Sequence, residues 1–241
     1  MNDDPVMLED FAPELAERTL PESDPDLEKH LPSRRDLFHG AALRLGAIAS
    51  APMLLAAAST EAFGRGGALP QRVVDTLNFA LTLEYLEDTF YRAALASPGT
   101  IPPYARRVFH QISKHERAHV ALLQGALGGL AVPKPSIDLT GKGQYGKVFH
   151  DFPALLALAQ TFEDLGVRAY KGQAPNLMGT PVLETALRIH SVEARHAAEI
   201  RLLRGAPIGE GAFDKPESKA LVLLVAGSFL NGSPQAPRST F

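Results

Sequence analysis

Two parts of this chain repeat the same polar residues at helical spacing, and no other feature constrains the fold as strongly. A Glu and a Tyr recur 79 residues later, and an E-x-x-H motif recurs 77 residues later. The equivalent pairs are Glu84 and Glu163, Tyr91 and Tyr170, Glu116 and Glu193, and His119 and His196. Because order and spacing agree in both halves, the sequence predicts two helix pairs related by an approximate twofold axis.

Apolar residues recur with a helical period in four long segments, at about 71–95, 103–127, 152–171 and 181–203. The first and third connections are short, whereas a segment rich in Gly and Pro separates the second and third helices. Two antiparallel pairs joined by one long crossover form a four-helix bundle. A fifth packing helix is expected within 215–230, in an apolar segment too short for a stable membrane span. We therefore expect an all-α domain at 70–230 and a mobile tail at 231–241.

Each E-x-x-H motif places its Glu and His on one helix face, among apolar neighbours. Buried carboxylates are costly unless they are paired or bind a cation. The chain has no Cys, so any metal must be held by oxygen and imidazole. Taken singly, each Glu could lie on a solvated face and each His could be a hydrogen-bonded core residue. Four Glu and two His together would gather up to four negative charges, which two divalent cations would neutralise.

Further polar residues lie close to the predicted centre. Tyr91 and Tyr170 follow Glu84 and Glu163 by two turns, so their hydroxyls could bond a ligand carboxylate, relay an electron or simply pack in the core. His190 could support a ligand, bind metal itself or serve only the structure. Glu87 and Asp88 share a stripe with Glu84 that is compatible with either an access path for cations or a solvated face.

The segments "TFEDLGVRAYKGQAP" and "RIHSVEARHAAEIR" resemble the exported ferritin-like domain family, which includes desiccation-related proteins. The resemblance covers about residues 70–230 and implies a ferritin-like bundle with a dinuclear centre. It implies six ligands: Glu84, Glu116, His119, Glu163, Glu193 and His196. The Glu of each E-x-x-H motif would bridge the two ions. An oxygen-rich donor set suits two iron ions, with two manganese ions as the alternative.

The N-terminal region carries different signals. Residues 1–33 hold ten acids against two bases, a net charge of −8, and are expected to be disordered. Arg34 and Arg35 precede a weakly apolar, Ala-rich run, so residues 34–63 resemble a twin-arginine export signal. An ordinary helix is the alternative. Export would place the protein in the periplasm or another extracytoplasmic compartment.

Three functions fit these features. The first is a ferroxidase-like or other oxidoreductase of stress defence that reacts with oxygen or peroxide. The second is peroxide dismutation like that of manganese catalase, and the third is a protective protein that binds metal without turnover. The remainder of the chain has a net charge of only +5, without a dense basic block, which argues against nucleic acid as a partner. A homodimer is compatible with the sequence.

Overall fold

The computed structural model describes residues 69–231. The predicted extension at 1–33, the signal segment at 34–63 and nearly all of the predicted tail lie outside these residues. The helices are α4 (Gln71–Ala96), α5 (Pro103–Leu127), α6 (Phe152–Leu177), α7 (Val182–Leu203) and α8 (Lys219–Ala226), with 3-10 turns at Gly128–Leu130 and Val148–His150 and short strands β1 (Ser136–Ile137) and β2 (Leu230–Asn231). The expected all-α fold is confirmed.

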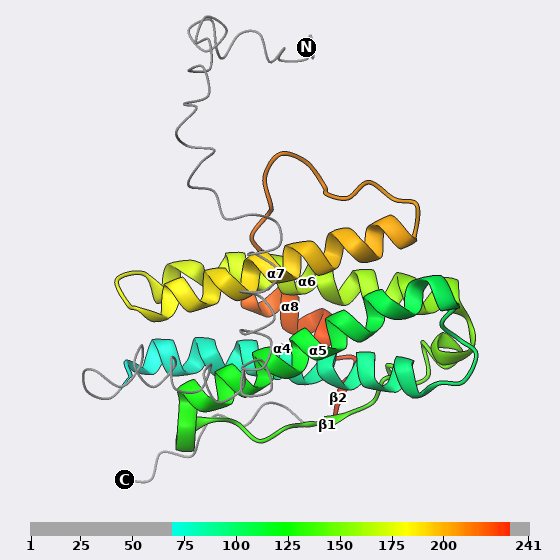
Figure 1. The fold of residues 1–241 in the computed structure, drawn as a ribbon. Coiled ribbons are helices and arrows are strands. Elements are labelled where there is room, and N and C mark those ends of the chain that lie inside the picture. The colour runs from blue at the N-terminus through cyan, green and yellow to red at the C-terminus, as the bar shows by residue number, and fades with distance from the viewer. Residues whose placement is uncertain (1–68, 232–241) are drawn as a thin grey trace, which may run out of the picture. The chain divides into compact units, whose positions relative to one another are not determined.

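The four long helices form two antiparallel pairs, α4 with α5 and α6 with α7 (Figure 1). The pairs meet where α4 packs against α6 and α5 packs against α7. The crossover from α5 to α6 runs along the bundle and carries β1, which pairs antiparallel with β2 near the C-terminal end of the described chain. The short helix α8 packs against α6 as the predicted fifth helix. The result is the ferritin-like arrangement of four helices with one crossover.

Local residue chemistry explains most helix ends. Pro103 occupies the first turn of α5, where its missing N–H costs nothing, and Gly128 ends this helix with a φ of 54°. Asp151 caps α6 by accepting a hydrogen bond from the backbone N–H of Ala154, and Ser218 caps α8 through the N–H of Leu221. These caps place the bounds of the bundle close to those expected from the sequence.

The third helix differs from expectation, because α6 continues to Leu177 and includes Pro175 instead of ending near residue 171. Leu177 is 2% exposed and packs with Leu77 and Val182. Pro175 lacks a backbone N–H and lies in the last turn of α6, so it disturbs few of the backbone hydrogen bonds of this helix. Burial of Leu177 therefore favours the longer helix over an earlier turn.

The core consists of two apolar clusters, one toward each end of the bundle. The aromatic cluster includes Phe90, Phe109, Leu155, Phe162 and Phe229. The aliphatic cluster includes Val73, Leu77, Leu123, Leu177 and Val182. Each of the four long helices contributes to both clusters, and its predicted ligand Glu lies near its midpoint. The fold thus buries four carboxylates in a polar layer between two hydrophobic ends.

The crossover is held to the bundle by buried polar contacts. The Asn78 side chain donates to the carbonyl of Leu130 at 2.9 Å and accepts from the N–H of Val132 at 2.8 Å.

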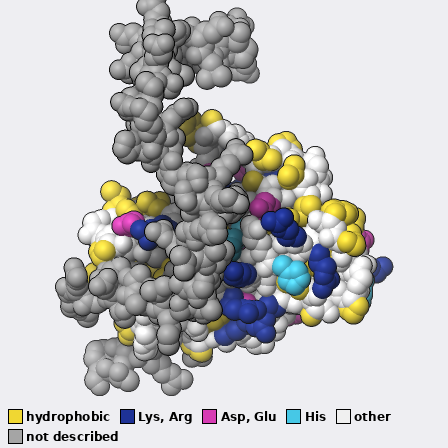
Figure 2. All heavy atoms as spheres, in the orientation of Figure 1, with side chains coloured by type: hydrophobic (Ala, Val, Ile, Leu, Met, Phe, Trp, Pro, Cys, Tyr) yellow, Lys and Arg dark blue, Asp and Glu magenta, His cyan; other side chains and the backbone are white. Residues whose placement is uncertain are grey.

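The outer face of α5 carries exposed basic residues, including Arg106, Arg107 and Lys114. Figure 2 shows Lys and Arg side chains gathered on one face of the molecule. Within residues 69–231, no helix is long and apolar enough to cross a membrane.

Candidate metal centre

The six predicted ligands lie together in the polar layer at the middle of the bundle. Each of the four long helices contributes one Glu, and α5 and α7 each add a His one turn further on. Glu84, Glu116, Glu163 and Glu193 have no solvent exposure, and His119 and His196 are 7% and 1% exposed. The solvated-face alternative for these Glu is therefore wrong.

One half of the cluster is arranged around His119. Its Nδ1 atom lies 3.2 Å from Glu84 Oε2, 3.2 Å from Glu116 Oε2 and 3.0 Å from Glu193 Oε1. Three carboxylates from three other positions in the bundle therefore converge on one imidazole nitrogen. Together these four residues form a group whose candidate ligand atoms all lie within 4.8 Å of one another.

The other half repeats the pattern around His196. Its Nδ1 atom lies 2.9 Å from Glu116 Oε1, 3.4 Å from Glu163 Oε2 and 3.7 Å from Glu193 Oε2. These four residues also form a group with ligand atoms within 4.8 Å. Glu116 and Glu193 belong to both groups, and each turns one carboxylate oxygen toward each His. Each of these two carboxylates could therefore offer one oxygen to a cation held in either group.

Several polar atoms of the cluster are buried without a hydrogen bond of good geometry. They are Glu116 Oε1, Glu163 Oε2, both carboxylate oxygens of Glu193, and His196 Nδ1. Buried polar atoms are almost always satisfied, and unsatisfied ones indicate a missing ion or water. All five are atoms that bind iron or manganese, so the residues present fit a pair of such ions.

A family model for the ferritin-like domain matches residues 72–206. This match covers more than half of the 241 residues. The chain belongs to the ferritin-like domain family. A comparison with curated proteins found no match. The matched region includes all six predicted ligands and both helix pairs that position them.

Burial and the closeness of charged side chains shift the pKa values of the predicted ligands. Burial alone would lower the pKa of His119 and His196, but the facing carboxylates outweigh it, raising the pKa of His119 well above its ordinary value and that of His196 to about 12. Burial raises the pKa of Glu163 to about 7 and, with the nearby Glu193, raises the pKa of Glu116 well above its usual range. Burial opposes ionisation of Glu193 too, but the two facing imidazoles of His119 and His196 lower its pKa.

The two tyrosines bond the carboxylate of the opposite half. Tyr91 on α4 donates to Glu163 Oε1 at 2.5 Å, and Tyr170 on α6 donates to Glu84 Oε1 at 2.6 Å. Each terminal Glu therefore keeps its Oε2 atom near a His while a phenol holds its Oε1 atom. Of the roles left open by the sequence, the structure displays hydrogen bonding to a candidate ligand for both tyrosines, and Tyr91 also packs in the aromatic cluster.

Two other histidines have different surroundings. His115 Nδ1 lies 2.9 Å from His196 Nε2, and the two rings stack. Burial and the charge of His196 lower the pKa of His115, so a neutral His115 accepts the Nε2–H of His196. His190 does not join the cluster: its Nε2 lies 4.0 Å from Asp214. The sequence did not single out His115 as a partner of His196.

The acidic stripe beyond Glu84 is buried, contrary to the solvated-face alternative. Asp88 is 6% exposed and lies near two cations, with Lys134 Nζ at 3.5 Å and Arg92 at 3.6 Å from its Oδ2 atom. Glu87 is 4% exposed, and burial followed by the charges of Glu193 and Glu84 raises its pKa well above the ordinary value. Two adjacent acids therefore have different surroundings, and among residues 69–231 only Asp88 lies near cationic side chains.

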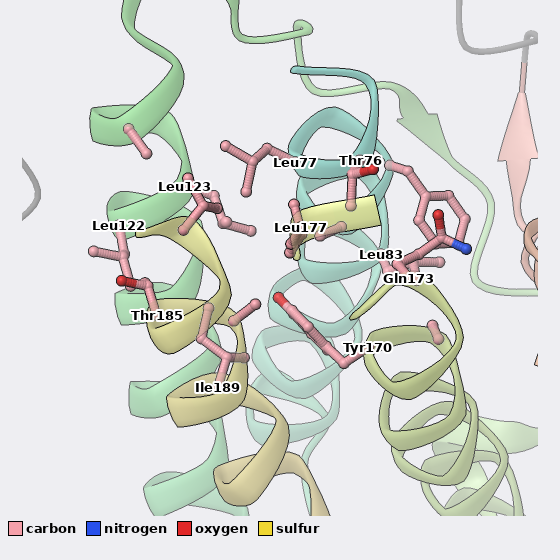
Figure 3. A pocket seen from close by; sticks show the side chains of 16 residues that line it. Thr76, Leu77, Leu83, Leu122, Leu123, Tyr170, Gln173, Leu177, Thr185 and Ile189 are labelled. Carbon is pink, nitrogen blue, oxygen red and sulfur yellow. The ribbon is translucent and has the colours of Figure 1, made fainter. Parts of the chain in front are cut away.

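An apolar cavity of about 20 Å³ lies within the aliphatic end of the bundle. Its walls include Leu77, Leu123 and Ile189, and the Tyr170 ring forms part of its lining (Figure 3). The Tyr170 side chain therefore both lines this cavity and donates a hydrogen bond to Glu84.

Proposed function

We propose that this ferritin-like protein binds two iron or manganese ions and acts as an oxygen- or peroxide-reactive oxidoreductase of the ferroxidase-like kind. The observation that carries the proposal is the sharing of two carboxylates. Glu116 and Glu193 each direct one oxygen toward the His119 half and the other toward the His196 half. A single ion would need only one set of ligands, whereas this structure has two sets that share Glu116 and Glu193.

When bound, two adjacent reduced metal ions would supply the electrons that oxygen or peroxide needs, which the side chains of this chain cannot do alone. Glu84 and His119 would complete one binding position, and Glu163 and His196 would complete the other. Tyr170 and Tyr91 hold the outer oxygens of Glu84 and Glu163, which limits how far these terminal carboxylates can rotate. Burial on all four helices excludes bulk water and so protects the reactive centre.

Protons and metal ions compete for the same atoms in this arrangement. The Nδ1 atoms of His119 and His196 face the carboxylates, so each must release its proton before it can bind a cation. His196 keeps its Nε2–H on His115, which orients its ring with the Nδ1 lone pair toward the centre. The protein thereby supplies preorganised ligands at nearly fixed positions.

The test begins with the metal. Protein purified from its own compartment should contain two iron or manganese ions per chain, measured by elemental analysis. Addition of Fe(II) under air should then give Fe(III) faster than in buffer, whereas peroxide loss with manganese-loaded protein would favour catalase-like chemistry. Two tightly bound metals with neither activity would favour a protective protein without turnover, and absence of bound transition metal would refute the proposal.

We further propose export through the twin-arginine machinery and a role in extracytoplasmic stress or desiccation defence. Support comes from Arg34 and Arg35, from the apolar run that follows them, and from the resemblance to exported ferritin-like proteins. Twin-arginine substrates can fold and bind their metal before export. Replacing both arginines by Lys should retain the protein in the cytoplasm, and unchanged export of this variant would contradict the proposal.

A further inference from the structure

The repeat that relates the two halves preserves the polar layer but not the size of the apolar side chains beyond it. At three pairs of equivalent positions, one half has a buried Phe where the other has a smaller residue. The pairs are Phe90 and Ala169, Phe162 and Leu83, and Phe109 and Ala186, at offsets of 79, 79 and 77 residues. The Phe90 and Phe162 rings contact edge to face, with centroids 5.1 Å apart. The smaller member of each pair lines the apolar cavity, so the cavity occupies space that rings fill in the other half.

The size and the walls of this cavity suit a small apolar molecule. Its volume of about 20 Å³ exceeds the roughly 10–15 Å³ that one water molecule requires, and leaves space for a molecule of two atoms. Water in a cavity also needs polar partners. Two hydroxyls of the lining are already engaged, because Thr76 donates to the carbonyl of Arg72 at 2.8 Å and Tyr170 donates to Glu84. Most of the remaining wall is aliphatic, so the cavity favours an apolar occupant.

The walls of the cavity lie close to the predicted ligands along every long helix. On three helices, a wall residue is four positions from a ligand, which corresponds to a rise of about 6 Å. These pairs are Ala80 and Glu84, Leu123 and His119, and Ile189 and Glu193. On α6, the Tyr170 ring lines the cavity and its hydroxyl bonds Glu84 (Figure 3). Glu84, His119 and Glu193 belong to one candidate ligand group, so a molecule in the cavity would lie beside that group.

We infer that this cavity is a binding place for dioxygen beside the His119 half of the cluster. The inference rests on the proposed oxidoreductase and deepens it, because it favours dioxygen over peroxide as the molecule that approaches from this end. Dioxygen is diatomic and apolar, and it needs no hydrogen-bond partner. Hydrogen peroxide would leave its O–H groups without acceptors against aliphatic walls, which is costly. The two halves of the cluster therefore differ in their access to dioxygen.

The test uses dioxygen itself with the full chain freed of metal. Dioxygen is paramagnetic, so it speeds the relaxation of nearby methyl groups in NMR spectra. The repeat supplies internal references, because Ile189 and Leu123 at the cavity are equivalent to Ile112 and Ile200, which are also buried. Under dioxygen pressure, with nitrogen as the diamagnetic reference, the methyl groups of Ile189 and Leu123 should relax faster than those of Ile112 and Ile200. Equal relaxation in the two halves would overturn the inference.

Two substitutions change the volume of the cavity in opposite directions. Ala186→Val adds two methyl groups to its wall and should abolish the excess relaxation at Leu123. Ala121→Val makes the same change on the exposed surface of α5 and is the matched control, which should keep the excess. If Ala186→Val fails to fold by circular dichroism, Ile189→Val decides, because it removes a methyl group from the wall and should increase relaxation at Leu123. Excess relaxation that persists in folded Ala186→Val, or no increase in Ile189→Val, would contradict the inference.

Kinetics separate the role of the cavity from the proposed centre. In protein loaded with Fe(II), Ala186→Val should raise the KM for dioxygen by about tenfold, while its metal content and its rate with peroxide stay at wild-type values. An unchanged KM in the folded variant would refute the role of the cavity in the reaction. Wild-type protein that binds no transition metal would instead refute the proposed function and the dioxygen role with it, whereas faster relaxation at Ile189 and Leu123 would still establish a gas-binding cavity.

Discussion

Metal binding should release protons, and the number released can be worked out from the cluster. In the metal-free protein at pH 7, His119 and His196 are both protonated, because the facing carboxylates raise the pKa of His119 well above its ordinary value and that of His196 to about 12. Both Nδ1 atoms must be deprotonated to bind cations. At least two protons therefore leave when two ions bind, and Glu116 and Glu163, whose pKa values are also raised, add to this number.

The magnitude follows from linkage. Each displaced proton changes the affinity tenfold per pH unit, which corresponds to about 1.4 kcal/mol. Two protons therefore strengthen the combined binding of two ions by about a hundredfold, or about 2.7 kcal/mol, for each unit of pH increase near neutrality. Glu193 does not alter this slope, because its pKa is lowered and it is ionised throughout this range.

Titration calorimetry with Mn(II) gives this number directly. Binding enthalpies measured at pH 7 in two buffers with different protonation enthalpies differ in proportion to the protons released. His119→Gln provides the control, because it should release about one proton fewer if it still folds and binds. Release of fewer than one proton per chain, or an affinity independent of pH between 6 and 8, would show that the imidazoles are not ligands and would refute the reasoning.

Three further predictions follow from the same contacts. Glu84→Gln and Glu163→Gln should each lose one of two ions, whereas Glu116→Gln should weaken both; equal stoichiometry by elemental analysis in all three would contradict the shared-carboxylate geometry. Tyr170→Phe removes a partly buried hydrogen bond to a carboxylate and should lower the free energy of unfolding, measured in urea, by about 1.5–3 kcal/mol. Leu187→Ala, on the exposed side of α7, is the near-neutral control. In metal-free protein, His119, His196 and Glu163 have raised pKa values, so the folded state binds protons more tightly than the unfolded state does. The stability that each group contributes is fully present below its unfolded pKa and is lost as pH rises toward its folded pKa, so the melting temperature should fall as pH rises above about 5. A melting temperature that rises with pH over this range would contradict the assigned pKa shifts.

The sequence predicted the fold and the six central residues because both depend on helical periodicity. Residues three apart share a helix face wherever the helix packs, so each E-x-x-H motif was already a pair with a known relative position. The short and long connections limited how the helices could be arranged. Both kinds of information are local, and the structure agrees with them in the bounds of α4, α5 and α7 to within about two residues.

Contacts between distant segments were beyond this reasoning. Tyr91 shares a face with Glu84, yet it bonds Glu163, because its side chain reaches across the interface between α4 and α6. The continuation of α6 through Pro175 depends on a buried site for Leu177 that only the assembled bundle creates. The attachment of the crossover to Asn78 likewise requires knowledge of where the loop passes. Each of these features depends on a tertiary partner that periodicity cannot identify.

Departures from the repeat carry information of a different kind. The residue equivalent to His115 at the 77-residue offset is Val192, which cannot accept a hydrogen bond from an imidazole. His196 is thus supported by a neighbouring ring from α5, and α7 offers His119 no such residue at the matching position. If the proposed two-ion centre forms, the support of His196 by His115 makes the surroundings of the two imidazoles unequal, and any difference between the two binding positions is expected to arise from departures of this kind.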